Sequence, residues 1–192
     1  MAKKGLNKAV VVDCAARLAD AEGIVGLSMA RLAKTLGIAL PSLYAHVRSL
    51  ENLRQEISLA VNAELSRLMG EAIQGRSGRN AIFALARAYR AYAVTHPGRY
   101  AAATLIAPDF SDPRAVEVAK ACANVVYDAL RGYGLEGDDL THAARFFRAG
   151  LHGFVSIEGQ GGFGLDLGVD ASFGSFLAAA DRALNSWELA RP

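Results

Sequence analysis

The sequence has few cysteines and no long apolar run. Neither Cys14 nor Cys122 has a second cysteine or a histidine near it at metal-ligand spacing, and both fall in helical apolar patterns, so we expect buried free thiols and no metal. No apolar run approaches the roughly 18 residues needed to cross a membrane. Residues 1–4 lead into an amphipathic stretch rather than into the apolar core of a signal peptide. These absences predict a cytoplasmic protein.

The usual catalytic residue patterns are also missing. There is no Ser/His/Asp set, no HExxH motif, no pair of carboxylates at helical spacing on an apolar face, and no cysteine near a histidine. The glycine-rich run at residues 159–164 lacks the Lys-Ser/Thr end of a phosphate-binding loop and does not follow a strand, so we interpret it as a flexible connection. We therefore predict neither an enzyme nor a bound cofactor.

The composition is apolar for a chain of 192 residues. Hydrophobic residues make up 52% and charged residues 21%, and the mean hydropathy is +0.18. Such a chain is not disordered, and it carries more apolar surface than a monomer needs, which favours an oligomer or a ligand cavity. The formal charge is +2, but residues 1–57 hold eight Lys/Arg against five Asp/Glu, so the N-terminal third is the basic end.

Apolar residues recur at helical spacing along almost the whole chain. Alternating runs bounded by hairpin turns are absent, so the pattern predicts an all-α fold with about nine helices. Glycine and proline residues mark most of the expected ends. The expected segments are residues 11–19, 29–36, a short helix from Pro41, 53–68, 82–93, a short apolar stretch at 100–106, 113–129, 140–158 and 173–184.

The clearest local pattern lies within residues 27–53. Ser28 is a suitable N-cap, the apolar positions of residues 29–36 follow one helix face, and Gly37 is placed to end that helix in a left-handed conformation. Pro41 suits the first turn of a third, short helix. Two short helices joined by a glycine-containing turn are typical of a helix-turn-helix, a motif that helical proteins use both with and without DNA.

The residues of this turn also resemble a known signature. Residues 36–47 read Leu-Gly-Ile-Ala-Leu-Pro-Ser-Leu-Tyr-Ala-His-Val. This run closely resembles the signature of TetR-family transcriptional regulators, in which a Leu-Gly-Val turn leads into a recognition helix ending in Leu-Tyr-x-His-Val or Leu-Tyr-x-His-Phe. Tyr44 and His46 form the Tyr-x-His pair, which is the discriminating element.

The resemblance implies a role for each side chain of the recognition segment. Leu43 and Val47 would anchor the segment in the core, and a second group would face base edges in the major groove of DNA. Tyr44, His46 and Ser28 would contact phosphates. The alternative is that Tyr44 is a core aromatic residue and His46 a solvated surface histidine. The base-facing group comprises Leu40, Pro41, Ser42 and Ala45.

Two positions depart from the family pattern. Leu50 stands where many members have lysine, and Ala30 stands where some have a base-reading arginine. A phosphate contact and a base contact are lost with them, and Arg48 or Arg54 would supply substitute charge. The small base-facing side chains lead us to expect contacts to thymine methyl groups and readout of DNA shape rather than Arg–guanine pairs.

The C-terminal part carries a second resemblance. Residues 148–158, with the later Gly-Gly-Phe-Gly run and Asp-x-Ser-Phe run, resemble the C-terminal domain of a TetR subgroup named for a Trp-His-Gly signature, although no tryptophan adjoins His152 here. In the family the last two long helices of each subunit pack against the same two helices of the partner subunit as a four-helix bundle. Two apolar stripes in this sequence match that arrangement. The same stripes could instead be intramolecular core. The expected homodimer contacts are Leu151, Phe154, Val155, Phe173, Phe176 and Leu177.

A small-molecule pocket is implied by the resemblance and permitted by the composition. Aromatic rings and hydroxyl groups lie on helices expected to surround the centre of the C-terminal domain. Each could be a core residue instead, and the histidine could equally be a satisfied interface residue. The expected effector-binding residues are Tyr89, Tyr92, Tyr100, Phe110, Tyr127, Phe147 and His152.

These observations predict a DNA-binding domain over residues 1–55 and a ligand-binding and dimerisation domain over residues 56–192. The function they favour is a repressor that a small-molecule effector releases from double-stranded operator DNA by changing the spacing of two recognition helices. The alternatives are a helical small-molecule carrier or enzyme without DNA binding, an activator, or a non-specific nucleoid protein. The near-neutral charge argues against the last of these.

Overall fold

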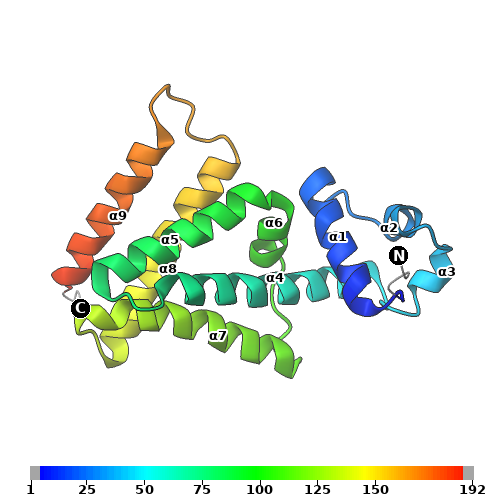
Figure 1. The fold of residues 1–192 in the computed structure, drawn as a ribbon, viewed down its shortest axis with the longest axis horizontal. Coiled ribbons are helices and arrows are strands. Elements are labelled where there is room, and N and C mark those ends of the chain that lie inside the picture. The colour runs from blue at the N-terminus through cyan, green and yellow to red at the C-terminus, as the bar shows by residue number, and fades with distance from the viewer. Residues whose placement is uncertain (1–4, 188–192) are drawn as a thin grey trace. The chain divides into compact units, whose positions relative to one another are not determined.

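The computed structural model describes residues 5–187, and within them it contains nine α-helices, one short 3-10 helix and no strand (Figure 1). The predicted all-α fold with about nine helices is confirmed. No helix in this part of the chain is both long and apolar enough to span a membrane. The helices are α1 Lys8–Glu22, α2 Met29–Leu36, α3 Leu40–Leu43, α4 Leu50–Ile73, α5 Gly78–Thr95, α6 Pro97–Leu105, α7 Pro113–Leu130, η1 Arg131–Tyr133, α8 Gly137–Gly159 and α9 Val169–Asn185.

The contacts divide the described chain into two compact units. Residues up to 64 and residues 95–119 form one, here called the N-terminal unit. Residues 65–94 and those from 120 onward form the other, the C-terminal unit. The predicted functional boundary at residue 55 is a separate matter from this division and stays a prediction.

Local capping explains where the first helices begin and end. The Asn7 Oδ1 accepts the Val10 N–H at 3.0 Å, and the Ser28 Oγ accepts the Arg31 N–H at 3.3 Å, so each satisfies one amide at a helix start. Gly37 ends α2 at φ 68° and ψ 31°, a left-handed conformation that glycine adopts without steric cost. The predicted N-cap at Ser28 and the predicted left-handed end of α2 at Gly37 are confirmed.

Two expectations about the elements need correction. Helix α4 extends beyond the expected segment 53–68 to Ile73, because Gly70, inside a long helix, lowers its stability without ending it. The apolar stretch at 100–106 belongs to a helix, α6, which starts at Pro97.

Cys14 is buried as expected, whereas Cys122 is only half-buried. Its partial burial is the main cause that raises the pKa of the Cys122 thiol.

The N-terminal unit joins α1 and α6 by close backbone packing. An ideal Cβ built on Gly98 would lie 1.9 Å from the Ala19 carbonyl oxygen, so only glycine fits at this position. The Asp20 carboxylate of α1 accepts the Arg99 N–H at 2.8 Å and lies 3.0 Å from the Arg99 Nε. His96, the residue before α6, makes no side-chain capping bond, so Asp20 caps α6 from a neighbouring helix.

A buried carboxylate, Glu56, joins three segments of the same unit. Its oxygens lie 2.5 Å from the Lys8 Nζ and 2.8 Å from the Arg114 Nη2, while Glu56 itself is buried. Burial raises the pKa of Glu56, but the hydrogen bonds from Arg114 and Lys8 outweigh that effect and hold the pKa below its usual value. The ionised form is therefore the one that the fold stabilises.

We expect Glu56→Gln to lower the unfolding free energy by about 1 kcal/mol at neutral pH. The pKa of Glu56 is lower in the folded state than in the unfolded state. The stability that this difference provides is present above the unfolded-state pKa, and it is lost as pH falls from about 5 through the folded-state pKa. Wild type should therefore lose more stability than Glu56→Gln between about pH 7 and about pH 3.5, as measured by urea midpoints. Glu71→Gln, at an exposed pair with Arg67, is the control. If the urea midpoints of wild type and Glu56→Gln differ by the same amount at both pH values, this account is contradicted.

The C-terminal unit has a core of large apolar side chains from α5, α8 and α9. Ile82, Leu85, Phe147 and Leu177 are all less than 2% exposed. Near the ends of α8 and α9 the four aromatic rings of Phe154, Phe163, Phe173 and Phe176 form a cluster.

Arg90 of α5 connects the same three helices. Its Nε donates to the Glu158 carboxylate of α8 at 2.7 Å, its Nη1 lies 2.7 Å from Asp170 of α9, and its guanidinium stands 4.7 Å from the Phe173 ring centroid. The hydrogen bonds to Glu158 are the largest of the causes that raise the pKa of Arg90. The position of α5 beside α8 and α9 is thus fixed by charge as well as by apolar packing.

Candidate nucleic-acid interface

The helix-turn-helix is built from α2, a turn at residues 37–39 and the four-residue helix α3. Met29, Leu32 and Ala33 bury one face of α2. Helix α3 is too short to be stable alone, so its position depends on the side chains that anchor it. Pro41 lies in its first turn, as predicted.

Burial divides the recognition segment into two groups. Leu43 is 0% exposed and Val47 1% exposed, which confirms that both side chains lie in the core. Tyr44 is 49% exposed and is therefore not a core aromatic residue, and His46 and Ser28 are half-buried. Leu40, Pro41, Ser42 and Ala45 are all exposed. The residues predicted to meet DNA are thus accessible, and their contacts with DNA stay a prediction.

The turn between α3 and α4 is held by a reciprocal pair of hydrogen bonds. The Ser49 Oγ accepts the Asn52 N–H at 3.0 Å, and the Asn52 Oδ1 accepts the Arg48 N–H at 3.1 Å. The Ser49 side chain therefore caps the start of α4. Arg48 is exposed, whereas Arg54 is half-buried with its Nε shielded from solvent, so Arg48 is the better placed of the two substitute cations.

Sequence reasoning missed an ion pair that joins α1 to α2. Arg31 donates from Nε to the Glu22 carboxylate at 2.9 Å, and its Nη2 makes a second, closer contact with the same group. These hydrogen bonds lower the pKa of Glu22 and raise that of Arg31. Arg31 lies in the first turn of α2, so this pair ties that end of the helix to α1 across residues 23–28.

The structure brings only some of the predicted effector-binding residues together. Tyr89 and His152 meet across α5 and α8, with 3.5 Å between the tyrosine Oη and the histidine Nδ1. Phe147 and Tyr92 are buried in the C-terminal unit, where Tyr127 is half-buried. Two residues fall in the N-terminal unit instead, Tyr100 and Phe110. Phe110 is 63% exposed on the connection before α7, and its role in effector binding stays a prediction.

The predicted dimer contacts are mostly buried within one chain, and their role in dimerisation stays a prediction. Four of the six side chains are at most 4% exposed within one chain, so the chain itself already covers them. A partner could contact them only if the residues around them repacked. Phe154 and Phe176 are half-buried. The four core residues are Leu151, Val155, Phe173 and Leu177.

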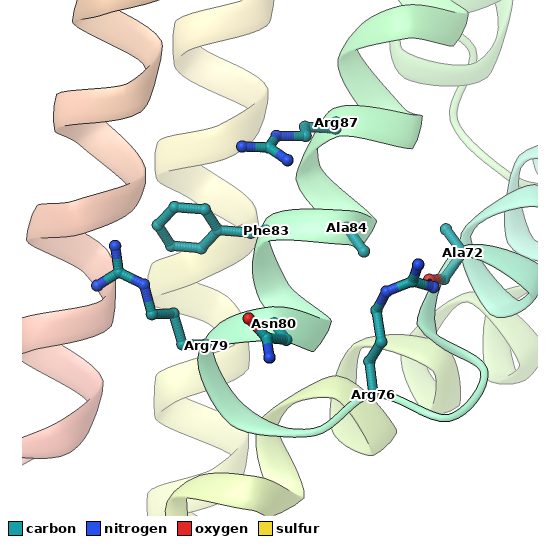
Figure 2. Close-up of a pocket in the computed structure, with 7 residues that line it drawn as sticks. All are labelled: Ala72, Arg76, Arg79, Asn80, Phe83, Ala84 and Arg87. Atoms are coloured by element: carbon teal, nitrogen blue, oxygen red, sulfur yellow. The ribbon is translucent and has the colours of Figure 1, made fainter.

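Sequence reasoning also missed a pocket of about 580 Å³ in the C-terminal unit, which three arginines line (Figure 2). None of the predicted effector-binding residues lines it. The four-residue spacing of Arg79, Phe83 and Arg87 was a signal that could have indicated it, since such residues share one helix face. Within residues 5–187 no group of three or more His, Cys, Asp or Glu could hold a metal ion.

Comparison with known proteins gives matches in keeping with this geometry. Residues 82–180 match the family model described as "Tetracyclin repressor-like, C-terminal domain". The uncharacterized HTH-type transcriptional regulator Rv0681 of Mycobacterium tuberculosis (strain ATCC 25618 / H37Rv) is 37% identical over 168 residues, which cover 88% of this chain and 77% of that protein. The uncharacterized HTH-type transcriptional regulator YobS of Bacillus subtilis (strain 168) is 36% identical over 155 residues, covering 80% and 79%.

A solved structure shows the same fold at lower identity. It is TetR from Acinetobacter baumannii AYE, with a TM-score of 0.72, 17% identity, and coverage of 94% of this chain and 97% of that one. The family model that matches the C-terminal part does not test the Trp-His-Gly subgroup, which stays a prediction.

Proposed function

The chain belongs to the TetR family of transcriptional regulators, and from that premise we propose that it is a repressor of the homodimeric, effector-released kind. The observation that carries the proposal is the burial pattern of the recognition segment. Leu43 and Val47 are buried and anchor the segment, while five neighbouring side chains are exposed: Leu40, Pro41, Ser42, Tyr44 and Ala45. Two such segments, one per subunit, would enter successive major grooves about 34–36 Å apart.

The exposed side chains favour a particular mode of DNA reading. Leu40, Pro41 and Ala45 offer apolar contacts that suit thymine methyl groups, and Ser42 offers one hydroxyl. Tyr44, His46 and Arg48 are suited to phosphates, which fix register without reading sequence. We expect specificity to come from these small contacts together with DNA shape.

Selection from a random duplex library tests the proposal, and an enriched palindrome is the expected result. Tyr44→Ala and His46→Ala should each weaken binding to that palindrome about tenfold, because each removes a hydrogen bond to a charged phosphate. His142→Ala, at an exposed histidine of α8, should leave the affinity unchanged. Binding no tighter to any selected sequence than to random duplex would favour a helical carrier or enzyme instead.

The dimer contact that we propose lies on the outer side of α8 and on the loop that follows it. Phe146 and Ile157 of α8 are 43% and 45% exposed, and three large apolar side chains of the loop are exposed as well. Exposed apolar side chains along a helix and its adjoining loop suit an interaction surface. The loop residues are Phe163, Leu165 and Leu167.

Ile157→Arg should therefore weaken dimerisation at least about tenfold, since it places a charge in the centre of an apolar contact. Sedimentation at micromolar concentration measures the dimer fraction, and an unchanged melting temperature checks that the variant folds. Val94→Arg, at a 62% exposed apolar residue of α5, is the matched control. If both variants remain dimeric, the interface lies elsewhere.

The effector site that we propose centres on Tyr89 and His152, and Tyr127 belongs to the same unit. The two polar side chains are part-buried and face each other, which suits orientation of a mostly apolar ligand. Release of DNA requires the effector to favour the DNA-incompetent state, and a switch from 1:99 to 99:1 needs about 5.5 kcal/mol of such preference. The proposal includes a cytoplasmic location and no catalytic activity.

A further inference from the structure

The arginine-lined pocket of the C-terminal unit has an unusual charge balance. Arg76, Arg79 and Arg87 line it together with Asn80, Phe83 and two alanines, and no carboxylate does. Figure 2 shows Arg79, Phe83 and Arg87 reaching to one side of α5, with Arg76 on the other side beside Ala72 near the end of α4. Three cationic groups around one hollow repel each other, and a bound anion would relieve that repulsion.

Phe83 holds two of these cations in place. The guanidinium carbon of Arg79 lies 4.6 Å from the ring centroid and that of Arg87 lies 5.9 Å from it. In Figure 2 the two guanidinium groups lie on opposite sides of the ring, and both are within the distance at which an aromatic ring attracts a cation. Because the ring orders both side chains in advance, less conformational entropy is lost when an anion binds.

Only one of the three arginines is neutralised within the described part of the chain. The Arg79 Nη1 lies 2.9 Å from Asp181, a buried carboxylate that also accepts the Tyr133 hydroxyl at 2.7 Å. Arg76 donates from Nη1 to the Ala72 carbonyl oxygen at 2.6 Å, which leaves its charge uncompensated. Among the described residues Arg87 contacts no carboxylate and interacts instead with the Phe83 ring. Two positive charges and the Asn80 amide therefore remain for a ligand.

We propose that this pocket binds a small anion carrying at least two oxyanion groups, either phosphates or carboxylates. Guanidinium groups suit both, because their planar fork can donate two parallel hydrogen bonds to one oxyanion. A volume of about 580 Å³ lies within the range of small-molecule sites. The site shares no residue with the proposed effector site and does not depend on the proposed DNA binding.

Calorimetric titration of the full chain with inorganic pyrophosphate and with citrate tests the proposal. We expect saturable binding of at least one probe at one site per chain, and we expect Arg76→Gln/Arg87→Gln to weaken it at least about tenfold. Both side chains are exposed, so the double variant should keep the wild-type melting temperature. Binding of pyrophosphate alone identifies a phosphate ligand, and binding of citrate alone identifies a polycarboxylate.

The matched control removes the same charge elsewhere on the C-terminal unit. Arg131→Gln/Arg145→Gln replaces two exposed arginines outside the pocket and should leave the affinity within twofold of wild type. Equal weakening by the two double variants would show a response to net charge alone and would overturn the site. Absence of saturable binding by either probe up to about 10 mM would overturn it as well.

Discussion

Replacing Gly98 with alanine is expected to lower the unfolding free energy of the N-terminal unit by about 3 kcal/mol. The new Cβ would lie 1.9 Å from the Ala19 carbonyl oxygen and 2.4 Å from the Asp20 backbone nitrogen. Both are backbone atoms inside α1, so no side-chain rotation can make room. Helix α6 must therefore move away from α1, or α1 must bend.

Movement of α6 would also break its cap. The Asp20 carboxylate holds the Arg99 N–H and the Arg99 guanidinium at about hydrogen-bond distance, and both contacts depend on the close approach at Gly98. A helix that loses its capping carboxylate leaves a backbone amide unsatisfied and loses a favourable charge at its positive end. The packing and capping losses thus act in the same direction.

Urea unfolding of Gly98→Ala and Gly164→Ala measures this effect against a matched control. A Cβ on Gly164 would meet no atom within 4 Å, and its φ lies outside the left-handed region. Gly164→Ala should therefore leave the midpoint unchanged or raise it slightly, because alanine lowers the entropy of the unfolded chain. An unchanged midpoint for Gly98→Ala would mean that α1 and α6 do not approach as closely as the structure shows.

The features that the sequence predicted well depend on neighbours along the chain. Ser28 and Gly37 act on amides or carbonyls within a few residues of themselves, so their roles follow from local spacing. Leu43 and Val47 are buried as the family resemblance implied, although local spacing alone does not predict it.

The features that the sequence did not predict depend on distant segments. Gly98 reads as simple punctuation beside Pro97, and only the position of α1 explains why it must be glycine. The apolar stripe of α8 indicates burial, but periodicity does not say whether α9 or a partner covers Leu151. Asp181 likewise lies far along the chain from Arg79, so the charge balance of the arginine pocket was not visible in the sequence.

Replacing Leu43 with alanine is expected to cost about 3 kcal/mol and to weaken operator binding more than loss of any exposed side chain of the same segment. Leu43 is fully buried, and a helix as short as α3 has almost no stability of its own, so this anchor determines whether the recognition segment is ordered. Without the anchor, the recognition segment would become ordered only when DNA binds. The apparent affinity then falls in proportion to the fraction of free protein whose segment is already ordered.

Ser42→Ala separates anchoring from contact in the same helix. Ser42 is exposed, so its loss should leave the urea midpoint unchanged and alter operator affinity only through its own contact with DNA. Leu43→Ala should lower the midpoint and reduce affinity for every DNA sequence by the same factor, because an unfolded segment loses specific and non-specific contacts alike. A Leu43→Ala protein with the wild-type midpoint and reduced affinity would instead place Leu43 at the DNA surface, against its burial in the core.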